Sequence, residues 1–199
     1  MPTRHTDYIV VIDLECLCWD GSEKERSFPE IIEIGACKLN TKTLQTTNKT
    51  SYLIKNMYGS VSDFCTKLTT ITQDQLNKEG ISFPEALVRL RQDFQPQTRQ
   101  WASWGEFDKI RFKEQCQFFN LAYPLSEMHR NVKDEYHMMA GLKKGMSVKK
   151  ACDQLGIEFE GTLHRGDDDA WHIAKILGMM MGFQRDEFKQ HLIDLNSTY

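Results

Sequence analysis

The sequence predicts one α/β domain. Strand-like apolar segments fill the first third of the chain, helical patterns fill most of the remainder, and no internal repeat or linker separates them. The 199 residues, 40% of them apolar, are sufficient to bury one full-sized core. We therefore expect a single domain over residues 1–199.

Three antiparallel strands are expected at the N-terminal end. Residues 8–15 begin with an unbroken apolar run, typical of a strand that is buried on both faces, and finish in carboxylates. Residues 31–39 alternate well enough for a second strand. A polar turn at residues 40–43 then leads to a third strand, which ends near Ile54.

Helices are expected in the rest of the chain, with one short strand between them. Residues 82–94 form an amphipathic helix, because Ser82 can cap it, a proline stands in the first turn and apolar residues share one face. Residues 101–104 form a short strand before Gly105, and helical spacing returns over residues 107–119. The remaining helices are predicted at residues 134–144, 148–155 and 168–181 and in the C-terminal segment 185–199, where the pattern runs from Arg185 to Leu195.

Composition excludes several kinds of protein. The formal net charge of −3 gives no general attraction to phosphate, so a histone-like or tail-type nucleic-acid binder is not expected and any nucleic-acid binding must be local. No stretch approaches the roughly 18 consecutive apolar residues of a membrane-spanning helix. The six cysteines contain no C-x-x-C pair and no apolar signal segment opens the chain, which indicates reduced thiols in a cytoplasmic protein.

A pair of carboxylates stands at the end of the first predicted strand. Asp13 and Glu15 are two residues apart, so on a strand both side chains project from the same face. Buried like charges this close are costly unless a cation neutralises them, and hard oxygen ligands suit Mg²⁺ or Mn²⁺. Taken alone, such a pair is more often a strand end that enters a solvated loop.

Further acidic residues occur where two predicted helices begin. Asp108 follows the glycine turn after the short strand, and Asp169 lies five residues after His164 in a glycine-containing loop that leads into a helix. Each has a simpler explanation, since acidic residues favour the first turn of a helix through its macrodipole. Together, however, the segments place carboxylates at the ends of separate elements of an α/β core, with a histidine beside the last.

These segments resemble a known family. Residues 13–15, 104–108 and 164–170 are similar, in order and spacing, to the three motifs of the DEDDh exonuclease family, and they span residues 13–169. Four longer stretches resemble the 3′ histone mRNA exonuclease branch of that family, which is associated with enhanced RNA interference and known chiefly for RNA ends. They are residues 13–20, 28–35, 64–73 and 103–105.

The resemblance implies a fold and an activity. The fold is the three-layer RNase H-like exonuclease fold, with a mixed five-stranded sheet and helices on both faces. The implied activity is metal-dependent 3′→5′ hydrolysis of single-stranded nucleic acid, RNA preferred, with release of nucleoside 5′-monophosphates. Four carboxylates would hold two divalent cations, Mg²⁺ or Mn²⁺, and His164 would be the general base. By the family spacing the carboxylates are Asp13, Glu15, Asp108 and Asp169.

Substrate contacts are also implied. Leu14 lies between two of the expected ligands, Trp104 and Phe107 offer aromatic faces for a base, and Arg165 offers a cation for phosphate. Core packing is the alternative for both aromatic residues. Phe107 stands where close relatives commonly carry tryptophan. Further candidate phosphate contacts, which are equally typical of a solvated face, are Lys143, Lys144, Lys149 and Lys150.

Several alternatives remain open at this stage. The same site would serve a DNA-directed exonuclease, because discrimination depends on how the pocket meets the terminal 2′-hydroxyl group. A small phosphodiesterase that acts on very short fragments and a catalytically silent module that binds 3′ ends are the others. The expected partners are single-stranded RNA or DNA 3′ ends, with no membrane and no stable protein partner. Residues 60–75 receive no role of their own.

Overall fold

The computed structural model describes residues 5–21, 28–142 and 145–196. Within these residues the strands form one five-stranded mixed sheet in the order β3-β2-β1-β4-β5. Strands β1 to β3 pair antiparallel, whereas β4 runs parallel to β1 and β5 runs parallel to β4. The predicted fold class is therefore confirmed. The strands are β1 (His5–Cys16), β2 (Ile31–Asn40), β3 (Thr46–Leu53), β4 (Arg99–Ser103) and β5 (His129–Asn131).

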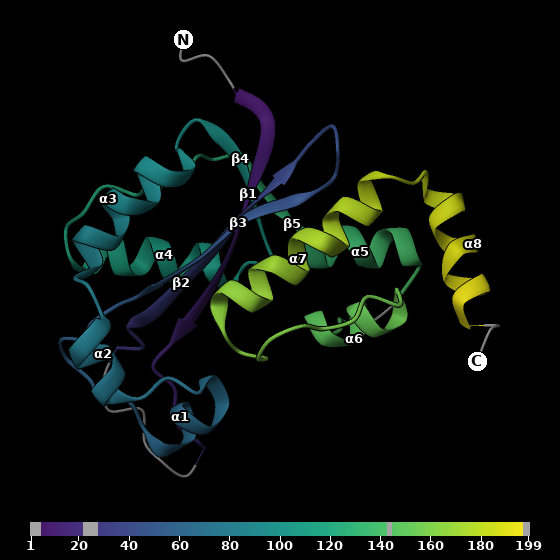
Figure 1. Ribbon diagram of the computed structural model, residues 1–199. Coiled ribbons are helices and arrows are strands. Elements are labelled where there is room, and N and C mark those ends of the chain that lie inside the picture. Colours follow the sequence, from purple (N-terminus) through teal and green to yellow (C-terminus); the bar gives the residue numbers. More distant parts are fainter. Residues whose placement is uncertain (1–4, 22–27, 143–144, 197–199) are drawn as a thin grey trace.

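Helices cover both faces of the sheet, as Figure 1 shows. One face packs against α3 (Phe83–Phe94) and α4 (Phe107–Phe118). The other face packs against α7 (Gly166–Met181), and three further helices of the C-terminal third share the core on this side of the sheet. These are α5 (Val132–Ala140), α6 (Val148–Gln154) and α8 (Arg185–Asn196).

The alternation of side chains along β1 explains its unbroken apolar run. Val10 and Ile12 belong to the core beneath α3 and α4, whereas Ile9 and Val11 belong to the core beneath α7. All four are at most 1% exposed, so the central strand has no solvated face. Towards the C-terminal end of β1 this apolar run gives way to the acids Asp13 and Glu15.

Two short helices fill the segment that received no assignment from sequence. They are α1 (Asp63–Thr69) and α2 (Gln73–Glu79), and they close a third small core with Leu17 and Ile32. The hydroxyl groups of Ser62 and Thr72 cap them by accepting backbone N–H bonds.

Some predicted boundaries were wrong. The helix expected to reach residue 144 ends at Ala140, because Gly141 takes a left-handed conformation with φ of 70° and its N–H group bonds to the His137 carbonyl. The three-residue strand β5 was not foreseen. The C-terminal helix is described as far as Asn196, and residues 197–199 lie outside the described part. Within that part, no helix combines the length and apolar character needed to cross a bilayer.

A close glycine contact joins α7 to the sheet. A Cβ atom added to Gly35 of β2 would lie 1.8 Å from the carbonyl carbon of Gly166, and one added to Gly166 would lie 3.0 Å from the carbonyl oxygen of Asp13. The backbone at the start of α7 therefore rests directly on β1 and β2, where no side chain can intervene.

We predict that Gly35→Ala lowers the free energy of unfolding by about 1–3 kcal/mol, since the new methyl group must push α7 off the sheet. Urea denaturation followed by circular dichroism measures the change. Gly21→Ala is the matched control, because no described atom lies within 4 Å of a Cβ atom built there. Equal stability of the two variants would contradict the close contact.

Candidate active site

The carboxylates predicted from sequence come together at one pocket. Asp13 and Glu15 project from the C-terminal end of β1, and Asp108 and Asp169 come from the first turns of α4 and α7. The pocket has a volume of about 350 Å³, and His164 also lines it. Its full lining comprises Asp13, Leu14, Glu15, Trp104, Phe107, Asp108, Ser147, Val148, Lys149, Leu163, His164 and Asp169.

Backbone hydrogen bonds hold two of the carboxylates in place. The N–H group of Leu14 donates to Oδ1 of Asp108 at 3.0 Å, which ties the start of α4 to β1. The N–H group of His164 donates to Oδ2 of Asp169 at 2.9 Å, which ties the histidine loop to α7. Each bond joins residues from two elements, so the pocket depends on the docking of both helices.

Burial makes these carboxylates difficult to ionise. Desolvation, followed by repulsion from Asp108, Asp169 and the other acids, raises the pKa of Asp13 well above its usual value. Burial likewise raises the pKa of Glu15 to about 9, of Asp169 to about 7 and of Asp108 to about 6. For Asp108 the hydrogen bond from Leu14 partly offsets the effect of burial.

The donor set fits a hard divalent cation. Ligand atoms of Glu15, His164 and Asp169 all lie within 4.8 Å of one another. None of the ion pairs formed by the described residues involves Asp13, Glu15, Asp108 or Asp169. Clustered oxygen ligands without a neutralising side chain are the arrangement that Mg²⁺ or Mn²⁺ stabilises.

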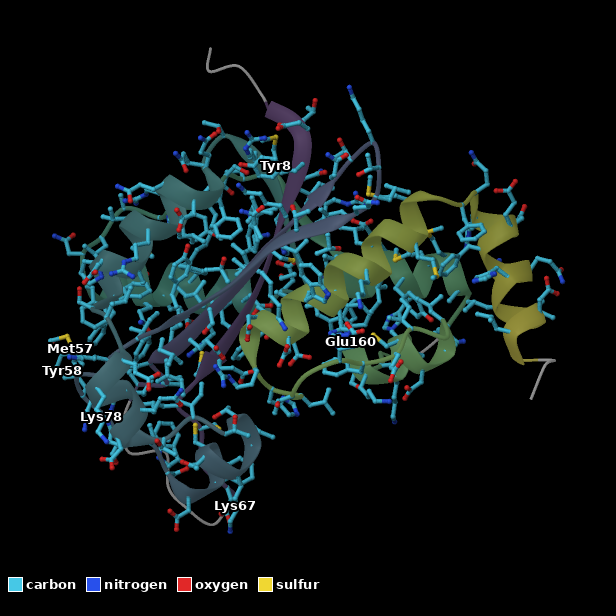
Figure 2. All side chains as sticks on the ribbon, viewed as in Figure 1. Tyr8, Met57, Tyr58, Lys67, Lys78 and Glu160 are labelled. Atoms are coloured by element: carbon cyan, nitrogen blue, oxygen red, sulfur yellow. The ribbon has the colours of Figure 1, made fainter. Side chains whose placement is uncertain are left out.

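The loop that carries His164 is fastened to α7. The side chain of His164 is exposed, and its backbone has a left-handed φ of 60°. Asp168 accepts a hydrogen bond from Thr162 N at 2.7 Å, and His172 accepts one from Glu160 N at 3.1 Å. Figure 2 marks Glu160 at the surface of this loop. The position of His164 is therefore set by the first turns of α7.

Arg165 lies away from the pocket. Its guanidinium group pairs with Glu33 of β2, with Nη2 to Oε1 at 2.8 Å and Nε to Oε2 at 3.2 Å. Glu33 is fully buried and also accepts hydrogen bonds from Gly166 N and the Ser51 hydroxyl. Arg165 is not among the residues that line the pocket, so the structure does not bring it to the other predicted contacts.

Sequence reasoning missed Glu33, although a signal was present. A lone acid inside the apolar strand at residues 31–39 requires a partner, because an unpaired buried charge is costly. The helix α7 has no side-chain N-cap of its own, and the carboxylate of Glu33 takes that place by accepting the Gly166 N–H bond. Pocket residues that were also missed are Ser147, Val148 and Leu163.

The other residues predicted to contact the substrate differ in their packing and in their exposure to solvent. Trp104 packs against the ring of Tyr136, and its indole N–H group donates to the Met146 carbonyl at 2.9 Å. Phe107 is 55% exposed and presents its ring to solvent at the pocket mouth. Leu14, by contrast, is buried. Among the lysines, Lys149 lines the pocket and pairs with Asp153, Lys150 is exposed outside its lining, and Lys143 and Lys144 lie outside the described residues.

Comparisons with known proteins identify the family of the chain. Residues 10–177 match the family model described as Exonuclease, RNase T type. The chain is 30% identical over 185 residues to "3'-5' exoribonuclease 1" of Homo sapiens, an alignment that covers 88% of this chain and 52% of the human protein. It is 26% identical to "Probable 3'-5' exonuclease KapD" of Bacillus subtilis, with 94% of this chain and 88% of that protein covered. The chain thus spans about half the length of the human relative.

A solved structure shares the fold over nearly the whole chain. It is the nuclease domain of 3'hExo, described as a DEDDh family member bound to rAMP. The TM-score is 0.78 at 28% identity, and the match covers 92% of this chain and 94% of that one.

Metal binding is expected to stabilise the folded protein. A cation that binds only the folded state adds about 2.7 kcal/mol at a concentration one hundred times its dissociation constant, so Mg²⁺ or Mn²⁺ should raise the melting temperature. Asp108→Asn should remove most of this gain. Asp74→Asn is the matched control, since Asp74 is also an acid in the first turn of a helix. The prediction is wrong if both variants respond to the cation equally.

The metal-free protein should lose stability with rising pH through Glu15. Its pKa is raised from 4.5 to about 9 on folding, so the folded state binds the proton more tightly and this stabilisation disappears between these two values as pH rises. Relative to Glu15→Gln, the wild type should therefore become at least about 1 kcal/mol less stable across that range in EDTA. Urea denaturation at a series of pH values measures the difference, and a difference independent of pH would refute it.

Proposed function

Because the chain belongs to the RNase T exonuclease family, we propose that it is a metal-dependent 3′→5′ exonuclease that acts on single-stranded nucleic acid, with RNA preferred. The observation that carries the proposal is the convergence of four carboxylates, three of them buried and Asp13 half-buried, and one exposed histidine on a single pocket at the end of β1. The products are nucleoside 5′-monophosphates, released one at a time.

The four carboxylates hold two divalent cations in this proposal. Asp13, Glu15, Asp108 and Asp169 supply the oxygen ligands, because all four line the same pocket. When bound, such cations neutralise charge on the phosphodiester group and favour deprotonation of the attacking water. The neighbouring carboxylates repel one another, and a bound cation removes this repulsion, which favours cation binding.

His164 accepts the proton of the attacking water at an imidazole nitrogen. A ring nitrogen of His164 lies within 4.8 Å of carboxylate oxygens of Glu15 and Asp169, and histidine is the side chain that most often serves as a general base. Two other histidines are occupied by structural roles. His172 is buried and stacks on Phe159, and His129 bonds to the Ser103 hydroxyl and packs on Trp101.

The terminal nucleotide occupies the pocket between Leu14, Trp104 and Phe107. A volume of about 350 Å³ suits one nucleotide rather than a long segment of chain. RNA is preferred because the relatives are exoribonucleases by name and the similar nuclease domain was solved with rAMP. One structure of a relative concerns 3'-end recognition of a histone mRNA stem-loop, but the human relative is about twice as long as this chain. Stem-loop recognition is therefore left out of the proposal.

The same proposal assigns the enzyme to the cytoplasm. All six cysteines are free, and five of them are buried. Free thiols persist in compartments that glutathione and thioredoxin keep reduced. No stable protein partner is required for the proposed reaction.

The test is to follow 5′-labelled single-stranded RNA and the matched DNA with Mg²⁺, Mn²⁺ or EDTA. We predict a ladder that shortens from the 3′ end only with metal, and faster with RNA. His164→Ala should lower kcat by about 10²- to 10⁴-fold while the thermal stabilisation by metal persists, because only the proton acceptor is lost. Asp108→Ala should lose both the exonuclease activity and the thermal stabilisation by metal.

His191→Ala is the control, since His191 stacks on Phe183 at α8, far along the chain from the pocket. Faster shortening of DNA would favour the DNA-directed alternative. A folded wild-type protein that binds 3′ ends but shortens neither strand with any metal would favour the catalytically silent module instead.

A further inference from the structure

A second cavity adjoins the active-site pocket. It has a volume of about 590 Å³ and shares Leu14, Glu15 and Phe107 with the pocket. Beyond the shared residues it is lined by Trp19 and by Arg111 of α4, among others. A substrate that fills the pocket therefore has a continuous hollow into which the rest of its chain can pass.

One face of α4 continues from this cavity to the far end of the helix. Phe107, Arg111 and Phe118 stand at positions i, i+4 and i+11, which share one side of an α-helix. Phe107 is 55% exposed and Phe118 is 51% exposed. Large aromatic side chains this exposed do not contribute to the core, and the function proposed above uses only the first of them.

The far end of this face carries a cluster of aromatic rings. Phe28 stacks on Phe118 with centroids 5.0 Å apart and planes 6° from parallel, and Tyr58 meets the edge of Phe118 at 5.3 Å. The guanidinium carbon of Arg111 lies 5.9 Å from the ring centroids of both Phe28 and Phe107. Arg111 therefore bridges the cluster and the pocket mouth.

The loop that presents Tyr58 is fixed by a buried acid. The carboxylate of Glu30 accepts hydrogen bonds from the backbone N–H groups of Met57, Tyr58 and Gly59, at 2.7, 2.8 and 2.9 Å. Met57 is 69% exposed and Tyr58 is 61% exposed, and both project outward at the margin of the molecule in Figure 2. A ligand that stacks here meets a loop that is already ordered, which lowers the entropic cost of binding.

We propose that Phe28, Tyr58, Phe107, Arg111 and Phe118, here called the α4 strip, guide the strand out of the pocket: Phe107 contacts the terminal nucleotide, and the other four residues bind the nucleotides immediately 5′ of it. The proposal rests on the proposed function and extends it from one nucleotide to a segment of strand. Aromatic faces stack on any base, so the strip gives affinity without sequence preference.

Two features favour a nucleic-acid strand over a protein as the occupant. The strip begins at Phe107, which lines the proposed catalytic pocket, so a ligand on the strip is continuous with the substrate. It also places a guanidinium group between aromatic rings, which suits the alternation of phosphate and base along a strand. Arg111 forms an ion pair with Glu114 in the free protein. This pair positions the guanidinium group on the strip, and a substrate phosphate would replace the carboxylate as its partner.

The length of α4 limits how much strand the strip can bind. Phe118 lies eleven positions after Phe107, which at 1.5 Å per residue corresponds to about 16 Å. A stacked strand rises about 3.4 Å per nucleotide, so the strip accommodates at most about five nucleotides. With the terminal nucleotide in the pocket, the gain in efficiency with substrate length should therefore reach a plateau at about six nucleotides.

The experiment measures kcat and KM for single-stranded RNAs from two to about twelve nucleotides that share the same 3′ nucleotide. For the wild type, kcat/KM should rise with length and level off near six nucleotides. Phe118→Ala and Tyr58→Ala should lower the ratio of long-strand to dinucleotide kcat/KM by about tenfold, through KM. Phe118→Tyr and Tyr58→Phe should retain the ratio, because a ring remains. Met138→Ala, a substitution of an exposed apolar residue on α5, is the control.

Each contrary outcome has a distinct meaning. An equal loss of kcat/KM on strands of all lengths, or no loss on any strand, overturns the proposed role of the strip. A change in oligomeric state by size-exclusion chromatography, without a length-dependent loss, also overturns it and assigns the cluster to protein association. Fluorescence anisotropy of labelled strands in EDTA tests the strip without cleavage. If the wild type cleaves no strand, the proposed function fails, whereas length-dependent binding lost in Phe118→Ala still supports the strip.

Discussion

The contact between the start of α7 and the paired strands β1 and β2 is the constraint on which the rest of the site depends. Gly35 and Gly166 allow the two backbones to meet, and Glu33 accepts the first N–H group of the helix while it pairs with Arg165. An anion at this end of α7 is favoured by the helix dipole, and the ion pair compensates its burial. Without this contact Asp169 would have no fixed position beside Asp13.

The three successive aspartates at the start of α7 take different roles because the helix turns them in different directions. Asp169 enters the pocket and accepts the His164 N–H bond. Asp168 points the other way, pairs with Lys49 of β3 and accepts a hydrogen bond from the loop before the helix. Asp167 lies 3.8 Å from the same lysine. One turn of helix therefore supplies a carboxylate to the pocket and fixes the loop that carries the histidine.

The site combines rigid positioning with electrostatic cost. Four acids are held by strands and helix starts whose geometry was settled by the core on both faces of β1, and burial raises their pKa values. In the function proposed above, bound cations would offset this electrostatic cost, so the same interactions would set both the stability of the protein and its affinity for the cations. At the pocket mouth the lining is aromatic rather than acidic, because Phe107 at the start of α4 exposes its ring there.

The sequence by itself determined the central strand, the first three antiparallel strands, the amphipathic helices and the segments that carry the acids and the histidine. These features are local, because apolar periodicity, caps and residue spacing describe one element at a time. The tertiary structure alone decided that Arg165 pairs with Glu33, that the three residues of β5 extend the sheet, and that Phe28, Tyr58 and Phe118 meet. The physical reason is that sheet register and helix docking join residues far apart in the chain, as in the pair Glu33 and Arg165, whose spacing no local pattern records.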